Sequence, residues 1–319
     1  MSQGVFYQEG RIIDFTPIAA CAAGDVVKHT SGLAGICTTD IAAGILGSLQ
    51  VSGVVTLAKK ITCALLAGGD VYWDVSASVA NFRADAGTPD FFIGTVAEDA
   101  AYTATTVKVR LNSRINYDID YERGGDGEFV ATMTGTTGVT LVLPGGQTKF
   151  NIANANEAQA LTLAPIRGVP VSAKPIVEFR LRLVSATGAN EDFEWGLIDV
   201  IPTTLATVES SNAFATFHND ADDLVIDTES DDGTTDRPIV TSGISHVAAD
   251  FTEYWLDARD ETNVRFYVNG VEADYNSLPR RLAAVLATVV YPFFMVAKLA
   301  SADVAEARLS RMRLRCQTE

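Results

Sequence analysis

The acidic side chains best suited to catalysis fall into two short segments of the second half of the chain. Glu191, Asp192 and Glu194 form one segment, and Glu253 and Asp257 lie four residues apart in the other. Retaining glycoside hydrolysis needs two carboxyl groups about 5–5.5 Å apart. On a strand, the second pair would share a face but lie about 13 Å apart. We therefore expect solvated carboxylates on a sheet surface and predict no catalytic residue.

A denser group of aspartates lies in the same half of the chain. Its members are Asp220, Asp222, Asp223, Asp231, Asp232 and Asp236. Calcium prefers several oxygen ligands, and aspartate-rich loops can supply them. Aspartate is also common in turns, where its side chain accepts backbone hydrogen bonds, and we favour this interpretation. We predict no metal and no cofactor, although the sequence leaves open whether Asp220, Asp222 and Asp223 bind calcium.

The remaining residue types form no pattern typical of an enzyme. The histidines His29, His218 and His246 are dispersed, and no serine lies in a Gly-x-Ser-x-Gly elbow. The four cysteines include no Cys-x-x-Cys pair, which argues against zinc. We interpret them as free, buried thiols of a protein made in a reducing cytoplasm. The sequence therefore predicts a protein that is not an enzyme.

The charge of the chain is strongly acidic and unevenly divided. The formal net charge is −16 and the pI is about 4.6, which argues against nucleic acid, because phosphate contacts need clustered Lys and Arg. Residues 1–115 contain 8 basic and 10 acidic residues, whereas residues 116–319 contain 16 basic and 30 acidic ones. The two parts are therefore expected to face different surroundings.

The N-terminus lacks a signal-peptide pattern, and the longest apolar stretch is too short to span a bilayer, so we expect no export and no membrane contact.

Short strand-like segments separated by glycine turns fill the first part of the chain. They are residues 26–27, 53–57, 71–73, 91–96 and 106–111. In the last of these, Val107, Val109 and Leu111 alternate with Lys108 and Arg110, as in a half-buried strand. This pattern ends near residue 112, and a polar, glycine-rich segment follows. We place a domain boundary there and predict domains at residues 1–115 and 116–319.

The β signal is stronger in the second part. Phe193, Trp195 and Leu197 are spaced to share one face of a strand, and residues 178–183 alternate strictly. Asn269 and Gly270 predict a two-residue hairpin turn, because both tolerate positive φ. Near the C-terminus, residues 310–316 alternate between arginines and less polar residues. Eight or more strands in about 200 residues suit a two-sheet sandwich.

Two regions resemble proteins of tailed-phage particles. In residues 1–113, the segments 6–10, 23–27, 32–36 and 68–74 resemble small capsid decoration (cement) proteins. Residues 117–319 resemble concanavalin A-like (laminin-G-like) jelly rolls, through residues 179–183, 193–197, 213–218, 253–257, 264–270 and 307–315. That fold also serves lectins and glucanases, but residues 191–194 lack the Glu-x-Asp-x-x-Glu spacing of the glucanases. The predicted fold class is all-β: a small β-barrel or β-sandwich domain followed by a concanavalin A-like jelly-roll sandwich.

The resemblance implies a structural virion protein that binds the outer surface of the capsid and stabilises the head. Its partners would be the major capsid protein and further copies of itself, with a trimer expected at local three-fold positions. The first domain would bind the shell through Phe6, Tyr7, Arg11 and Ile13, which lie in an early segment whose apolar side chains could anchor to a capsomer. The second domain would project outward. The chain would be made in the host cytoplasm and function on the virion.

Two other functions remain open at this point. The jelly roll could be a lectin-like module that binds glycans, with Trp255 and Tyr275 as candidate contacts, although core burial is the simpler interpretation of both. A polysaccharide depolymerase is the remote alternative. The row of Arg308, Arg311, Arg313 and Arg315 could pair with carboxylates of its own domain, which we favour, or dock on an acidic capsid surface.

Overall fold

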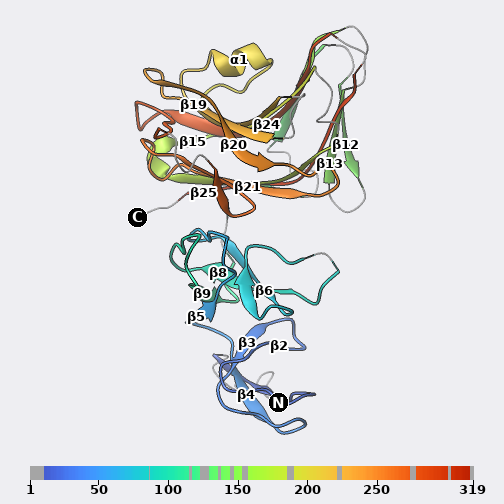
Figure 1. The fold of residues 1–319 in the computed structure, drawn as a ribbon, viewed down its shortest axis with the longest axis vertical. Helices are drawn as coiled ribbons and strands as arrows, with labels where there is room; N and C mark the ends of the chain where they lie inside the picture. Colours follow the sequence, from blue (N-terminus) through green and yellow to red (C-terminus); the bar gives the residue numbers. More distant parts are fainter. Residues whose placement is uncertain are drawn as a thin grey trace, which may run out of the picture. The chain divides into compact units, whose positions relative to one another are not determined.

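The chain forms two compact β-rich units, Met1–Ile115 and Asn116–Glu319 (Figure 1). The computed structural model describes residues 11–85, 87–114, 117–122, 129–135, 138–143, 147–152, 157–184, 190–220, 225–273, 278–300 and 303–316, without the side chains of residues 122, 138, 139, 141, 142 and 220. All strand pairs in its sheets are antiparallel, which confirms the all-β fold class. The only helical segments in these ranges are α1 (Leu205–Glu209) and the 3-10 turn η1 (Val171–Ala173). Within them, no helix has both the length and the apolar character needed to cross a bilayer.

The first unit begins with a four-stranded sheet. Its order is β1-β4-β3-β2, with bounds β1 (Ile12–Phe15), β2 (Val26–Lys28), β3 (Ala34–Cys37) and β4 (Gly47–Gln50). The core under this sheet is small: Cys37, Ile41, Leu49 and Val51 are fully buried, with four partly buried apolar residues packed against them. So few buried side chains give the sheet little hydrophobic stabilisation of its own.

A five-stranded sheet follows and curls into a small barrel. Its order is β5-β9-β8-β6-β7, with bounds β5 (Val54–Ala58), β6 (Asp70–Asp74), β7 (Val79–Asn81), β8 (Phe91–Val96) and β9 (Thr106–Leu111). The end of β5 reaches β7, because Lys59 forms a bridge with Ala80 and the Lys60 N–H donates to the Ala80 carbonyl at 2.9 Å. The expected alternation in β9 is confirmed, since Val107, Val109 and Leu111 are buried.

Asn112 joins the two sheets of the first unit. Its Oδ1 accepts the Ala34 N–H at 2.9 Å, and its Nδ2 donates to the carbonyls of Ala34 at 2.8 Å and Val51 at 2.7 Å. Its φ of 53° lies in the left-handed region, which asparagine tolerates better than most residues. One side chain therefore satisfies three backbone groups of the four-stranded sheet from the end of β9.

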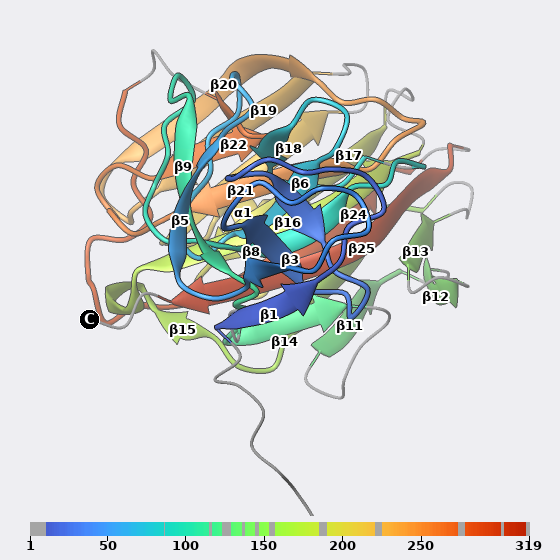
Figure 2. The ribbon, with the colours of Figure 1, turned by 90° about the horizontal axis from the view of Figure 1, so that it is seen from below.

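The second unit is a sandwich of two large sheets, in agreement with the expected jelly roll. The β25 sheet has the order β12-β13-β25-β16-β21-β22-β23, with β10 also paired to β25. Its bounds are β10 (Ile119–Glu122), β12 (Gly138–Leu143), β13 (Gln147–Ile152), β16 (Pro175–Leu183), β21 (Thr252–Asp257), β22 (Arg265–Val268), β23 (Val271–Ala273) and β25 (Ala305–Cys316). β25 lies beside β16, and β12 forms the sheet edge next to β13 (Figure 2).

The β17 sheet forms the other layer. Its order is β11-β14-β24-β17-β18-β19-β20, with the short β15 paired to β24. Its bounds are β11 (Phe129–Thr134), β14 (Gln159–Pro165), β15 (Val169–Pro170), β17 (Glu191–Ile198), β18 (Phe214–Asp220), β19 (Val225–Asp231), β20 (Asp236–Ser245) and β24 (Val289–Lys298). α1 lies against the outer face of this sheet, where Val208 packs with Ile198, Phe214 and Phe293 (Figure 1).

Aromatic side chains from both sheets fill the space between the layers. Trp195 stacks on Phe217 with ring centroids 5.6 Å apart, and it meets Tyr254 of the other sheet edge-on at 4.8 Å. Phe217 also meets Phe266 edge-on at 5.0 Å. Phe193, Trp195 and Leu197 face this core together, as their spacing predicts.

Two details of register test the sequence patterns. The Asn269-Gly270 hairpin is confirmed, because φ is 51° at Asn269 and 77° at Gly270 between β22 and β23. The strict alternation expected in β25 is wrong at Ser310. The register against β16 shifts there, so Leu309 and Met312 both face the core and Ser310 is the extra residue of a bulge.

The second unit should fold without the first, because it contains a complete two-sheet core of its own. A fragment of residues 116–319 is expected to melt cooperatively, within a few degrees of the corresponding transition of the full chain. Circular dichroism and calorimetry of both proteins measure this, and limited proteolysis should cut between residues 112 and 118. A fragment that lacks native β-sheet signal would show that the two units depend on each other.

Candidate functional site

The residues expected to contact the capsid lie at the start of the first unit. Phe6 and Tyr7 fall outside the described residues. Arg11 is exposed immediately before β1. Ile13 is half-buried and packs against the core of the four-stranded sheet, so it is a poor contact residue. The structure therefore leaves Arg11 as the one described member of this set that is free to meet a partner.

A second set of exposed apolar side chains lies on two neighbouring loops of the same sheet. Ile18, Ile45 and Leu46 expose 100%, 59% and 66% of their surface. The Gly44 N–H donates to the Pro17 carbonyl at 2.8 Å, which holds the two loops side by side. We use the name apolar loop pair for Ile18 on the first loop together with Ile45 and Leu46 on the second. Sequence reasoning missed them, because isoleucine and leucine between strands look like core residues.

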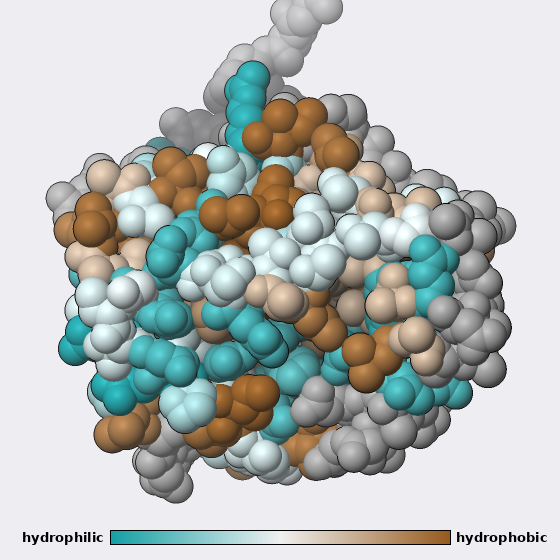
Figure 3. All heavy atoms as spheres, turned by 90° about the horizontal axis from the view of Figure 1, so that it is seen from above, coloured by the Kyte–Doolittle hydropathy of each residue, from teal (hydrophilic) through white to brown (hydrophobic). Residues whose placement is uncertain are grey.

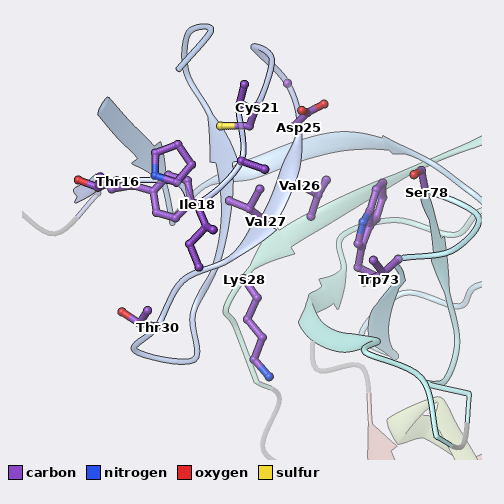
Figure 4. Close-up of a pocket in the computed structure, with 16 residues that line it drawn as sticks. Thr16, Ile18, Cys21, Asp25, Val26, Val27, Lys28, Thr30, Trp73 and Ser78 are labelled. Carbon is purple, nitrogen blue, oxygen red and sulfur yellow. The ribbon is translucent and has the colours of Figure 1, made fainter. Parts of the chain in front are cut away.

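A groove of about 670 Å³ runs beside the apolar loop pair. Ile18, Val26 and Val27 line one side and Trp73 the other (Figure 4). Ala19, Ala20 and Cys21 also line the groove. Its lining is mainly apolar, with Lys28 and Asp25 as the charged residues, so it suits contact with protein surface better than with a charged small molecule.

The face of the second unit that carries α1 has a different character. Its apolar residues, drawn brown, are separated into small groups by polar residues, drawn white and teal (Figure 3). Single exposed apolar residues are normal on soluble proteins. This face therefore resembles an ordinary solvated surface more than a continuous apolar contact patch.

The C-terminal arginine row pairs with carboxylates of its own unit, as we expected. Arg308 contacts Glu306 at 3.2 Å, Arg311 contacts Glu253 at 2.7 Å and Arg313 contacts Asp120 at 3.0 Å. Arg315 pairs with Glu178, and both side chains are buried. These ion pairs lie on the outer face of the β25 sheet. They occupy the arginines, so this row does not favour docking on an acidic surface.

The interpretation of the sandwich carboxylates as solvated is wrong for most of them. Glu191, Glu194, Glu253 and Asp257 expose only 3%, 4%, 2% and 7% of their surface. Glu253 contacts Arg311 and also Arg180 at 3.5 Å. Arg259 donates to both oxygens of Asp257, at 2.8 and 2.6 Å. A strand pattern shows which residues share a face, but it does not show that charged neighbours will cover that face.

Glu194 lies in a cluster of ionisable groups on the outer face of the β17 sheet. The His218 Nε2 lies 3.9 Å from oxygens of both Glu194 and Asp192. Burial raises the pKa of Glu194 to about 8, although the nearby His218 partly offsets this effect. Burial also raises the pKa of Glu229, which lies on β19, the strand next to that of His218. This arrangement can hold a proton near neutral pH, but it sets no pair of ionised carboxylates beside an open groove.

The aspartate group is only partly within the described residues. Asp222 and Asp223 lie outside them, as does the side chain of Asp220. Asp232 accepts hydrogen bonds from the backbone of Thr234 and Thr235 and pairs with Arg281 at 3.3 Å. Asp231 accepts the Gly233 N–H at 2.7 Å. For these two residues, the turn interpretation is correct.

A different carboxylate group has the spacing of metal ligands in the first unit. Among the described residues, Asp74, Asp85 and Asp90 bring one oxygen each within 4.8 Å of one another. Asp90 accepts the N–H groups of Val75 at 3.0 Å and Asp85 at 3.1 Å, and Asp74 accepts that of Ala77 at 2.9 Å. Turn hydrogen bonds account for this cluster.

The candidate glycan contacts do not form an exposed platform. Trp255 exposes 8% of its surface and lies across from Tyr267, with ring centroids 6.3 Å apart. Tyr275 lies outside the described residues. Trp255 is buried as expected, but it alternates with the core residues Tyr254 and Leu256 and is not part of the core between the sheets.

Comparison with known proteins gives one family match, and it lies in the first unit. Residues 7–111 match the family model described as phage cement protein. This match covers nearly all of the first unit and confirms the resemblance seen in residues 1–113. No curated protein matches the chain.

Solved structures are similar at a greater distance. They include the potassium-bound carbohydrate recognition domain of Emp46p, with 11% identity and a TM-score of 0.44 over 60% of this chain and 90% of that one. A putative β-glucanase from Mycobacterium abscessus has 12% identity and a TM-score of 0.45, over 62% of this chain and 100% of that one. A carbohydrate esterase from the Shiga toxin-encoding bacteriophage phi24B has 12% identity and a TM-score of 0.41, over 64% and 99%. Likenesses this distant say nothing about activity or ligand.

The raised pKa of Glu194 predicts a pH dependence of stability. The unfolded chain releases this proton near pH 4.5, whereas the folded chain keeps it up to about pH 8. Folding takes up a proton between these values, so the stability of the second unit falls as pH rises through this window. Glu194→Gln should therefore stabilise the unit at pH 8 by on the order of 1 kcal/mol or more, with little effect near pH 4.5.

Urea unfolding of the wild type and of the variant across this pH range measures the difference. The exposed Glu209 offers a matched control, because Glu209→Gln removes a carboxylate that the fold does not bury. An unchanged pH profile in Glu194→Gln, or the same change in Glu209→Gln, would contradict the assignment.

Proposed function

We propose that this protein, whose residues 7–111 match the phage cement protein family, binds the outside of a phage head and stabilises the assembled shell. The family match supports a structural role in the virion, and it is the observation that carries the proposal. A protein that binds the assembled lattice but not its separated subunits stabilises the lattice by mass action. This role needs no catalytic group.

The proposed contact with the capsid lies on the four-stranded sheet of the first unit. The apolar loop pair supplies three exposed side chains that lose unfavourable contact with water when a partner covers them. Arg11 directly precedes β1 of this sheet, and Phe6 and Tyr7 lie before it in the sequence. Ile13 is no longer part of this proposal, since it packs on the core.

Charge supports an outward position for the second unit. Residues 116–319 contain 14 more acidic than basic residues, and their C-terminal arginines are already paired. Such a unit is repelled by the phosphates of packaged DNA. The first unit contains only two more acidic than basic residues, so it can approach the shell without strong repulsion.

The proposed assembly is a trimer at local three-fold positions of the shell. Three copies that contact neighbouring capsomers together bind more tightly than one copy does, because each further contact becomes intramolecular.

The described carboxylates of the sandwich favour a non-enzymatic role, since Glu253 and Asp257 are held by arginines.

Binding to heads tests this proposal. The triple variant Ile18→Ser, Ile45→Ser, Leu46→Ser should bind DNA-filled heads that lack this protein at least about a hundredfold more weakly than wild type, because buried apolar anchors dominate interface energies. Co-sedimentation of the purified protein with the heads gives the affinity. Deletion of residues 1–10 should also weaken binding, and it leaves β1 in place.

A matched control removes apolar side chains of similar exposure from the second unit. Ile239, Val247 and Leu299 expose 44%, 55% and 55% of their surface. The variant with serine at these three positions should bind as wild type does. Equal weakening of both triple variants would refute the proposed contact, and a wild-type protein that does not bind heads would refute the function itself.

A further inference from the structure

Two of the four cysteine sulfurs lie against each other in the first unit. The Sγ atoms of Cys21 and Cys37 are 3.0 Å apart, and both residues are free thiols. A disulfide bond is about 2.05 Å long, so an approach of about 1 Å would join them. Cys63 and Cys316 have other surroundings: Cys63 donates to the Lys60 carbonyl at 3.5 Å, and Cys316 lies beside the Asp118 carboxylate.

The backbone around both cysteines is fixed by hydrogen bonds. The Cys21 N–H donates to the Ile41 carbonyl at 3.0 Å, and the Ile41 N–H donates back to Cys21 at 2.8 Å. Cys37 ends β3, and its N–H donates to the Asp25 carbonyl at 2.9 Å. Both side chains then pack on the same small core as Leu49. The fold therefore holds the two sulfurs together, although 16 positions separate them in sequence.

The two thiols differ in access to solvent. Cys21 is half-buried and is among the residues that line the groove beside Ile18 (Figure 4). Cys37 is 2% exposed, and burial raises its pKa to about 12, which keeps it a thiol at neutral pH. We therefore expect Cys21, the more exposed thiol, to react first and Cys37 to resolve the product.

We propose that Cys21 and Cys37 form an intramolecular disulfide when the protein meets an oxidising medium. With oxidised glutathione as the oxidant, the Cys21 thiolate attacks one glutathione sulfur, forms a mixed disulfide and releases one glutathione thiolate. Cys37 then gives up its proton and attacks the Cys21 sulfur, which releases the second glutathione thiolate. The two cysteines lose two electrons and two protons, and one glutathione disulfide becomes two glutathione thiols.

The cross-link closes a loop from Cys21 to Cys37 around a core of few buried side chains. Closing such a loop stabilises a fold mainly by restricting the unfolded chain. The four-stranded sheet should therefore resist unfolding better after oxidation than before. If the protein is a virion component, as proposed above, the bond would form after the particle leaves the reducing cytoplasm.

Thiol mapping of the purified full chain tests the pair. After equilibration with excess oxidised glutathione, acid quenching and alkylation, mass spectrometry should show a peptide that links Cys21 to Cys37, while Cys63 remains alkylated. Cys63→Ser should keep the link. Cys37→Ser and Cys37→Ala should instead accumulate a glutathione adduct at Cys21.

Thermal unfolding gives a second measurement. The oxidised wild type should melt several degrees above the reduced protein, and Cys21→Ser should show no difference between the two conditions. Full alkylation of Cys21 and Cys37 after oxidation, or a link between either of them and Cys63, would overturn the proposal. Binding to heads is measured in a separate experiment, so the absence of this disulfide would not contradict the proposed function.

Discussion

The aromatic core between the two large sheets determines the rest of the second unit. Trp195 packs on Phe217 and Tyr254, and these contacts join strands of both layers. Because side chains alternate along a strand, burying Trp195 turns its neighbour Glu194 to the outer face. The same rule turns Arg313 outward between Met312 and Leu314. One packing constraint therefore sets the positions of both charged outer faces, and each face must then satisfy its own charges.

The first unit has a much smaller core than the second and relies more on hydrogen bonds between its sheets. Its four-stranded sheet covers few fully buried residues, and Asn112 connects that sheet to the small barrel through three hydrogen bonds. Apolar residues that a larger core would bury stay exposed on its loops, with Ile18 fully accessible. A covering partner would bury these side chains. In this unit, the small core and the exposed apolar loops both follow from the distribution of apolar residues in the sequence.

Local pattern predicted the elements well and the sites less well. Two predictions depend only on residues close together in the sequence, and both are confirmed. One is that Trp195 shares a strand face with Phe193 and Leu197, and the other is the turn at residues 269–270. The burial of Glu194 depends on neighbouring strands that come from distant parts of the chain, so a single segment could not reveal it. Exposure of Ile18 depends on how two loops meet, and the meeting of Cys21 with Cys37 depends on a bridge to Ile41. Contacts of this kind require the assembled fold.

In the proposed function, the first unit attaches to the shell from outside while the acidic second unit projects away from the genome. Immunogold labelling of intact, DNA-filled particles with antibodies raised against residues 176–319 measures this most directly. We expect labelling of unopened particles over the head. Labelling that occurs only after the heads are opened would place the second unit inside and refute the proposed orientation.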